Sequence, residues 1–124
     1  MLYKLRGIAS KLCVLRVSLE VLAGGGVLLT DGNAASDCTK FGDYWTMLEA
    51  IRWDLVFAES WALSDPEERR ESKRVICAEI LIRKPVETCY ITGAYVSSEE
   101  AYSKLMKAGF TLAIEVNRHL FFLS

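Results

Sequence analysis

The 124-residue chain contains one histidine, His119, and four cysteines, none of which forms a C-x-x-C pair. Because zinc sites take their ligands from closely spaced cysteine or histidine pairs, this pattern argues against a metal centre. A single histidine also gives no confident Ser-His-Asp arrangement for nucleophilic catalysis, and we expect His119 to be half-buried in a terminal strand. Cys13 and Cys77 lie in apolar runs, so we expect both to be small buried side chains.

Long hydrophobic runs are missing as well. No segment approaches the ~18–20 apolar residues of a membrane span. Near the N-terminus, Lys4, Arg6 and Lys11 interrupt the apolar residues, so the uninterrupted hydrophobic stretch of a secretory signal is absent. Without an export signal, we expect the cysteines to be reduced and the compartment to be cytoplasmic.

The chain also lacks an excess of either charge. Its formal net charge is −1, so bulk electrostatics neither require nor exclude nucleic acid, and any basic patch must be local. Hydrophobic residues make up 52% of the sequence. A chain of this length and composition predicts one globular domain, residues 1–124, with its own core.

Strand patterns recur along the chain, clustered toward its C-terminal end. Apolar runs predict strands at residues 12–17, 27–30, 76–82, 89–96, 111–116 and 119–124. Between the second and third of these runs, the turn-rich segment DGNAASD begins with Asp31-Gly32, which favours a tight turn.

Helical signals lie between the strands. Apolar residues at three- and four-residue steps between Phe41 and Leu63 indicate one or two short helices. Ser64 or Asp65 is a suitable N-cap for a helix over residues 66–75. A second capped helix is expected from Ser98 to Ala108, closed by Gly109. The mixed order predicts an α+β fold with a mostly antiparallel sheet and short flanking helices.

Glu79 is the unusual residue of the predicted strand at 76–82. It is the one charged residue in ICAEILI. Burying an unpaired carboxylate costs several kcal/mol, so this side chain must find donors, stay protonated or face a wet cleft. Two interpretations follow: a structural carboxylate paired with an arginine or placed at a sheet edge, and a catalytic carboxylate.

The predicted helix before this strand carries a basic stripe. At 100° per residue, one arc of about 140° holds four cations, and the glutamates fall on the opposite arc. These cations are Arg69, Arg70, Lys73 and Arg74. The stripe is either a solvated face or a surface that attracts a nucleic-acid phosphate backbone.

Three stretches together resemble the DarT family of DNA ADP-ribosyltransferases. They are TDGNAASDCTKF, the long segment from IRWDLVFAESW through the arginine-rich helix to AEILI, and GAYV. The N-terminal MLYKLRG is similar to the family's PMLY segment, and AEILI to its AE-x-LV strand. These motifs follow one another in the family's order, and the resemblance runs over nearly the whole chain.

This resemblance implies an ADP-ribosyltransferase-like fold and an enzyme that transfers ADP-ribose from NAD to a base in single-stranded DNA. In the family this activity is a toxin restrained by a macrodomain antitoxin, DarG. The glutamate of the family's AE motif is catalytic, and by that motif it falls on Glu79. The stripe of Arg69, Arg70, Lys73 and Arg74 would then contact the DNA, and no metal is implied.

The family has a further region before its MLY segment, with a histidine-bearing NAD-binding part. The resemblance therefore implies that this chain corresponds to the C-terminal portion, and it leaves the NAD-contacting residues unidentified. We expect the isolated chain to bind NAD weakly or not at all, and an exposed apolar face to promote self-association or co-purification with a partner. Two interpretations stay open: a transferase, whole or truncated, and an inactive nucleic-acid-binding or interaction domain derived from the same fold.

Overall fold

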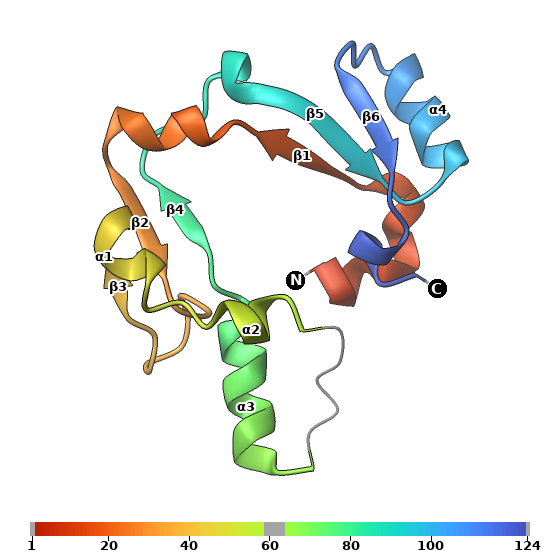
Figure 1. The fold of residues 1–124 in the computed structure, drawn as a ribbon. Helices are drawn as coiled ribbons and strands as arrows, with labels where there is room; N and C mark the ends of the chain where they lie inside the picture. The colour runs from red at the N-terminus through yellow and green to blue at the C-terminus, as the bar shows by residue number, and fades with distance from the viewer. Residues whose placement is uncertain (1, 59–63, 124) are drawn as a thin grey trace. The chain divides into compact units, whose positions relative to one another are not determined.

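A computed structural model describes residues 2–58 and 64–123 of the chain, which fall into two compact units (Figure 1). The terminal unit comprises residues 1–21 and 86–124, and the central unit comprises residues 22–85. The organisation of residues 1–124 as a single domain stays a prediction.

The terminal unit is built on a three-stranded sheet with the strand order β1-β5-β6 (Figure 1). Strand β1 (Cys13–Val17) is antiparallel to β5 (Ile91–Val96), and β6 (Ala113–Val116) runs parallel to β5. The 3-10 segments η1 (Leu2–Lys11), η3 (Thr88–Tyr90) and η4 (His119–Phe121) and the helix α4 (Glu99–Lys107) complete the unit. Ala94, Val96 and Phe121 are its most deeply buried apolar residues.

Helix α4 has the ends that the sequence predicts. Ser98 accepts a hydrogen bond at its Oγ from the backbone N–H of Ala101 at 3.2 Å, which caps the N-terminus. Gly109 follows the helix with a φ of +91°, a left-handed conformation that glycine adopts without a Cβ clash.

The central unit contains a second three-stranded sheet, with the order β3-β2-β4 and both neighbours antiparallel. After the 3-10 turn η2 (Leu19–Gly24), its strands are β2 (Val27–Thr30), β3 (Phe41–Gly42) and β4 (Ile80–Ile82). The helices are α1 (Tyr44–Leu48), α2 (Trp53–Val56) and α3 (Pro66–Val75). Its buried cluster comprises Leu29, Met47 and Ile51. With both helices and mostly antiparallel sheets present, the predicted α+β class is confirmed.

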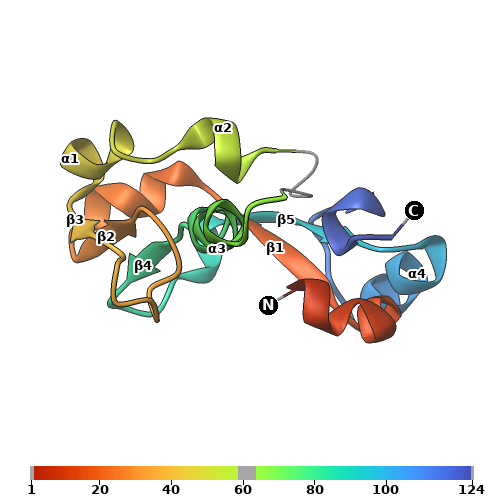
Figure 2. The same ribbon diagram turned by 90° about the horizontal axis from the view of Figure 1, so that it is seen from below.

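Helix α3 spans the predicted residues 66–75. The Asp65 carboxylate accepts a hydrogen bond from the Glu67 N–H at 3.1 Å, and Pro66 occupies the first turn, where its missing N–H costs nothing. In Figure 2 this helix is seen nearly end-on. Its C-terminal end leads directly into the segment that carries Glu79.

The prediction of a strand over residues 76–82 was wrong for its first half. The Ile76 N–H donates to the Ser72 carbonyl at 3.0 Å and the Ala78 N–H to the Val75 carbonyl at 2.9 Å, so the backbone continues to turn after α3. Strand pairing begins only at Ile80. Glu79 therefore lies directly before a short strand, not in the middle of a buried one.

The predicted terminal strand over residues 119–124 was also wrong for residues 119–123, and Ser124 lies outside the described residues. The Asn117 side chain accepts a hydrogen bond from the Leu120 N–H at 3.1 Å, and this local bond favours the 3-10 turn η4. His119 is exposed there. Cys13 is exposed and Cys77 half-buried, so the expected burial of the cysteines does not hold for Cys13.

Candidate functional site

The backbone of Glu79 is fixed by Thr30, the last residue of β2. Thr30 is fully buried. Its N–H donates to the Glu79 carbonyl at 3.0 Å, and its Oγ1 accepts from the Glu79 N–H at 3.0 Å. The hydroxyl in turn donates to the Gly32 carbonyl at 2.7 Å. One buried side chain therefore joins the segment of Glu79 to the loop that follows β2.

The Glu79 side chain is exposed, and one of its oxygens is held by a backbone donor. Oε1 accepts a hydrogen bond from the Ala34 N–H at 3.1 Å. Within residues 2–58 and 64–123, Oε2 has no hydrogen-bond partner and Glu79 forms no ion pair. Pairing with an arginine, one form of the structural interpretation, is thus not what these residues show. The other form, a carboxylate at a sheet edge, fits the position of Glu79 directly before the edge strand β4. A carboxylate with one oxygen oriented and one accessible can accept a proton or a ribose hydroxyl.

The Ala34 N–H belongs to a loop, residues 31–40, that is closed by its own hydrogen bonds. The Asp31 Oδ1 accepts from the Lys40 N–H at 2.8 Å, which joins the two ends of the loop. The Asn33 Oδ1 accepts from the Ala35 N–H at 3.0 Å, and the Asn33 carbonyl accepts from the Thr39 hydroxyl at 2.7 Å. This Asx-type turn gives the loop one defined backbone path past Glu79.

Arg74, at the end of α3, reaches into the same loop. Its Nη1 donates to the Asp31 Oδ1 at 2.9 Å and to the Thr39 Oγ1 at 3.3 Å. Its Nε and Nη2 donate to the two carboxylate oxygens of Glu71 at 2.9 and 2.6 Å. The Arg74 carbonyl accepts from the Asn33 N–H at 2.9 Å. The side chain is only 14% exposed, so it is a structural clamp on the loop.

The charges in this cluster stabilise one another. Burial tends to raise the pKa of Asp31, but the hydrogen bonds from Lys40 and Arg74 outweigh it and hold that pKa below its ordinary value. The bidentate bond from Arg74 lowers the pKa of Glu71, and the same bond raises the pKa of Arg74. At neutral pH all three groups are ionised, so the Arg74–Asp31 ion pair holds the loop and the Arg74–Glu71 pair, within α3, holds the guanidinium.

The other three predicted DNA-contacting residues differ from Arg74 in their exposure to solvent. Arg69, Arg70 and Lys73 are exposed on α3. Of the four cations expected on the helical wheel, these three are exposed, whereas the Arg74 side chain is only 14% exposed and is bonded to Asp31 and Glu71. Arg74 and Glu79 belong to one hydrogen-bonded cluster through loop 31–40.

Sequence reasoning missed Thr30 and Ala34 as parts of the site. Ala34 contributes only a backbone N–H, which no residue-type pattern can reveal. Thr30 is the last residue of an apolar strand and immediately precedes Asp31-Gly32. The sequence signal for this part of the site was the TDGNAASDCT stretch as a whole. In the structure, this stretch lies next to the segment that carries Glu79.

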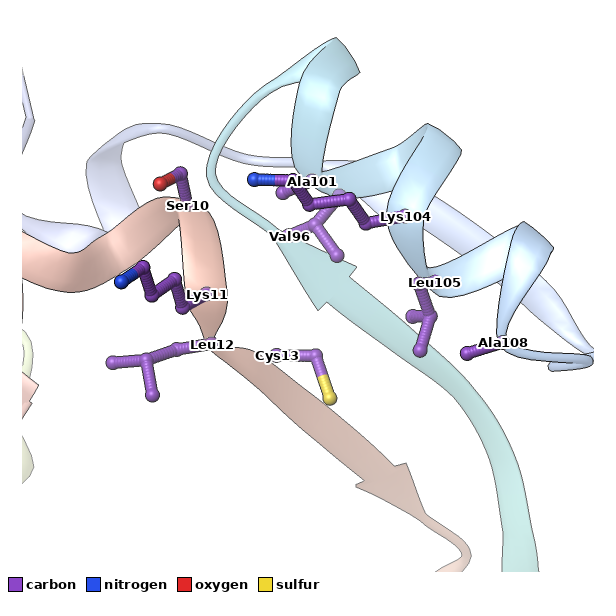
Figure 3. A pocket seen from close by; sticks show the side chains of 9 residues that line it. All are labelled: Ser10, Lys11, Leu12, Cys13, Val96, Ala101, Lys104, Leu105 and Ala108. Atoms are coloured by element: carbon purple, nitrogen blue, oxygen red, sulfur yellow. The ribbon is translucent and has the colours of Figure 1, made fainter.

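The terminal unit, to which Glu79 does not belong, contains a pocket (Figure 3). It measures about 390 Å³ and lies between the end of η1, the start of β1 and helix α4. Its lining is mostly apolar, with Cys13, Leu105 and Ala108 facing the space between β1 and α4 (Figure 3). None of the predicted site residues lines it, so it offers no support for the chemistry at Glu79.

Metal-binding clusters and membrane spans are both missing from the part of the chain that the structure describes. No group of three or more His, Cys, Asp or Glu side chains there could hold a metal ion. No helix in the same residues is long and apolar enough to cross a membrane.

Comparison with known proteins identifies relatives of this chain. Residues 1–122 match the family described as "ssDNA thymidine ADP-ribosyltransferase, DarT". A DNA ADP-ribosyl transferase–DNA ADP-ribosyl glycohydrolase fusion protein from Thermosipho africanus (strain H17ap60334) is 35% identical over 114 residues, which cover 87% of this chain and 28% of the relative.

Two solved structures have the same fold. Thermosipho africanus DarTG in complex with ADP-ribose aligns with a TM-score of 0.75 and 27% identity, over 99% of this chain and 33% of that one. Thermus sp. 2.9 DarT in complex with NAD+ aligns with a TM-score of 0.72 over 86% of this chain and 56% of that one. At 18% identity this second match shows the fold alone.

The chain therefore spans between about a quarter and somewhat over half of the length of these proteins. The family match covers nearly every residue and agrees with the fold of both units. It also confirms the resemblance that the AE motif and the DGNA turn indicated. On these grounds, the chain belongs to the DarT family of ssDNA thymidine ADP-ribosyltransferases.

Proposed function

We propose that this chain carries the catalytic carboxylate of an enzyme that transfers ADP-ribose from NAD+ to thymidine in single-stranded DNA. The observation that carries the proposal is the exposed Glu79 carboxylate, held at Oε1 by the Ala34 N–H and fixed at its backbone by Thr30. The family description names the reaction, and one structural neighbour was solved with NAD+.

The chemistry fits a carboxylate placed in this way. As the bond between nicotinamide and the ribose C1′ breaks, the electron pair leaves with nicotinamide and the ribose develops oxocarbenium character. Thymine in a nucleoside has one ring nitrogen that still carries a proton, N3. Attack of N3 on C1′ forms the new bond, and the N3 proton passes to the Glu79 carboxylate. The same carboxylate can orient the ribose hydroxyl and stabilise the developing positive charge.

The exposed cations of α3 suit the second substrate. Arg69, Arg70 and Lys73 follow one face of a helix that leads directly into the segment of Glu79. Cations on a helix attract the phosphates of a single strand and bring its bases near the carboxylate. Arg74 is not part of this DNA contact in the proposal, because its guanidinium is engaged with Asp31 and Glu71.

A macrodomain antitoxin of the DarG type is the proposed protein partner. The Thermosipho africanus relative is a fusion of a DNA ADP-ribosyl transferase with a DNA ADP-ribosyl glycohydrolase. A glycohydrolase that removes ADP-ribose from DNA would reverse the transfer proposed here. This pairing supports a toxin–antitoxin role for the chain, and a cytoplasmic location stays a prediction from the sequence.

Self-association is proposed from exposed apolar side chains on one strand. In the terminal unit, strand β1 exposes Leu15 at 46% and Val17 at 40%. Exposed apolar side chains on neighbouring positions of one face favour burial against another surface. A second copy of this chain is the occupant that we propose, and sedimentation of the chain at several concentrations decides between a dimer and a monomer.

Transfer of radiolabelled ADP-ribose is the test of the proposed function. The 124-residue chain is incubated with labelled NAD+ and single-stranded oligonucleotides that contain or lack thymidine. We expect label in the thymidine-containing strand alone. The inactive nucleic-acid-binding domain, the other interpretation of the sequence, predicts binding of both strands without label.

A further inference from the structure

We propose that Arg74 is a positioning residue for Glu79, which acts through loop 31–40 and contacts no DNA phosphate. This inference rests on the proposed function, in which the Glu79 carboxylate takes part in the transfer. It changes the role that the sequence suggested, where Arg74 was one of four cations on a DNA-binding stripe. The physical basis is the path of bonds from its guanidinium to the Ala34 N–H.

The first step of that path is the attachment of both loop ends to one side chain. Nη1 of Arg74 bonds to the Asp31 carboxylate at the start of the loop and to the Thr39 hydroxyl near its end. The Glu71 carboxylate holds the other side of the guanidinium. Because Glu71 lies on α3 with Arg74, the fork is fixed relative to the helix before it contacts the loop.

The second step is the close approach of the loop backbone to Arg74. The Asn33 N–H donates to the Arg74 carbonyl at 2.9 Å. Gly32 is buried beside it, and a Cβ at this position would overlap Nη1 and lie 3.0 Å from the Arg74 carbonyl oxygen. Glycine is therefore required for the loop to pack on the arginine. Arg74 thus contacts the loop with both its side chain and its backbone.

The third step is the hydrogen bond from the ordered loop to Glu79. Ala34 follows Asn33 directly, and its N–H points at the Glu79 Oε1, 3.1 Å away. If the guanidinium is removed, Asp31 and Thr39 lose their common partner and the loop gains alternative conformations. The Ala34 N–H would then orient Glu79 for only a fraction of the time. The expected consequence is a lower rate of transfer with little change in the apparent affinity for either substrate.

Arginine differs from lysine in a way that tests this model. The planar guanidinium bonds Glu71 on one edge while Nη1 reaches Asp31 and Thr39. A lysine ammonium is a single point charge and cannot span both carboxylates in this geometry. Arg74→Lys should therefore restore only part of the loop order that Arg74→Gln removes. A phosphate contact, in contrast, would be replaced by lysine with little effect on binding.

The experiment compares Arg74→Gln, Arg74→Lys and the control Arg52→Gln, which removes an exposed arginine that pairs locally with Asp54. Hydrogen exchange of the Ala34 amide is followed by NMR, which suits a chain of 13.9 kDa. We expect Arg74→Gln to speed Ala34 exchange at least about tenfold, Arg74→Lys to speed it less, and Arg52→Gln to leave it unchanged. Unchanged exchange in Arg74→Gln would overturn the proposal.

A second readout separates positioning from DNA contact. The salt dependence of single-stranded DNA binding should keep its slope in Arg74→Gln. A slope that falls by ~0.7, as expected when one phosphate is no longer neutralised, would also overturn the proposal. If Arg74→Gln does not fold, Thr39→Val removes the bond from Arg74 together with the bond from Thr39 to the Asn33 carbonyl. It should give the same direction of change in Ala34 exchange.

The transfer assay completes the test. With an active chain, Arg74→Gln should lower kcat at least about tenfold and change KM for NAD+ by less than about threefold. If the wild-type chain transfers no ADP-ribose, the proposed function fails. The Ala34 exchange and the salt slope still decide whether Arg74 orders the loop, so the two failures are distinguishable.

Discussion

The backbone N–H of Ala34 donates a hydrogen bond to Oε1 of Glu79 at 3.1 Å, across 45 positions of sequence. Two segments with separate local signals, a turn-rich loop and the approach to a short strand, meet at this bond. It fixes one carboxylate oxygen and leaves the other accessible. The bond also explains why the DGNA turn and the AE motif belong to one site.

Replacement of Glu79 by glutamine should abolish transfer without unfolding the chain. Glutamine keeps the shape of the side chain and can still accept the Ala34 N–H at its amide oxygen, but it cannot take a proton from thymine N3. We expect labelling of single-stranded DNA to fall ~10²-fold or more. The melting temperature should stay within about 2 °C of wild type, because an exposed side chain contributes little to stability. Equal labelling by both proteins would remove Glu79 from the mechanism.

Replacement of Thr30 by valine should destabilise the central unit. The hydroxyl bonds to the Glu79 N–H and to the Gly32 carbonyl, and valine of similar shape leaves both groups without that partner. We expect the free energy of unfolding to fall by about 2 kcal/mol in urea titrations. Thr92→Val is the matched control, since its exposed hydroxyl makes one long bond of 3.4 Å. A decrease no greater than that of the control would show that the Thr30 hydroxyl does not hold the site.

The exposed cations of α3 should set the salt dependence of DNA binding. Double replacement of Arg70 and Lys73 by glutamine should weaken single-stranded DNA binding and make its salt slope shallower by about 0.7 for each phosphate that is no longer neutralised. Lys104 and Lys107, on the last turn of α4, provide a control pair of equal charge. If the control pair lowers the slope as much as the α3 pair, the effect reflects net charge rather than DNA binding on α3.

Acid should weaken the clamp on loop 31–40. The folded pKa values of Asp31 and Glu71 lie below their ordinary values of 3.8 and 4.5. The unfolded chain therefore binds more protons near pH 4, so this stabilisation is complete above the ordinary values and is lost as the pH falls through the folded ones. The free energy of unfolding should drop between about pH 5 and pH 3. Asp31→Asn should flatten this dependence; a curve parallel to wild type would contradict the assignment.

Much of the secondary structure followed from local signals in the sequence. Asp65 and Pro66 fixed the start of α3, Ser98 and Gly109 bounded α4, and the strand at residues 27–30 has the predicted limits. Caps and turn residues act on neighbouring backbone groups, so their effects can be inferred without knowledge of the fold. The AE motif likewise indicates Glu79 from the sequence alone.

Tertiary structure decided the environment of the site. Ile76–Cys77 has the apolar composition of a strand, but its backbone turns with the end of α3, and Glu79 is exposed instead of buried. Helical spacing placed Arg74 on a basic stripe, but Asp31, 43 positions away, takes its guanidinium into the loop. Side-chain type and spacing determine which groups are present. Which partner each group finds depends on contacts between segments far apart in the chain, and only the folded structure contains these contacts.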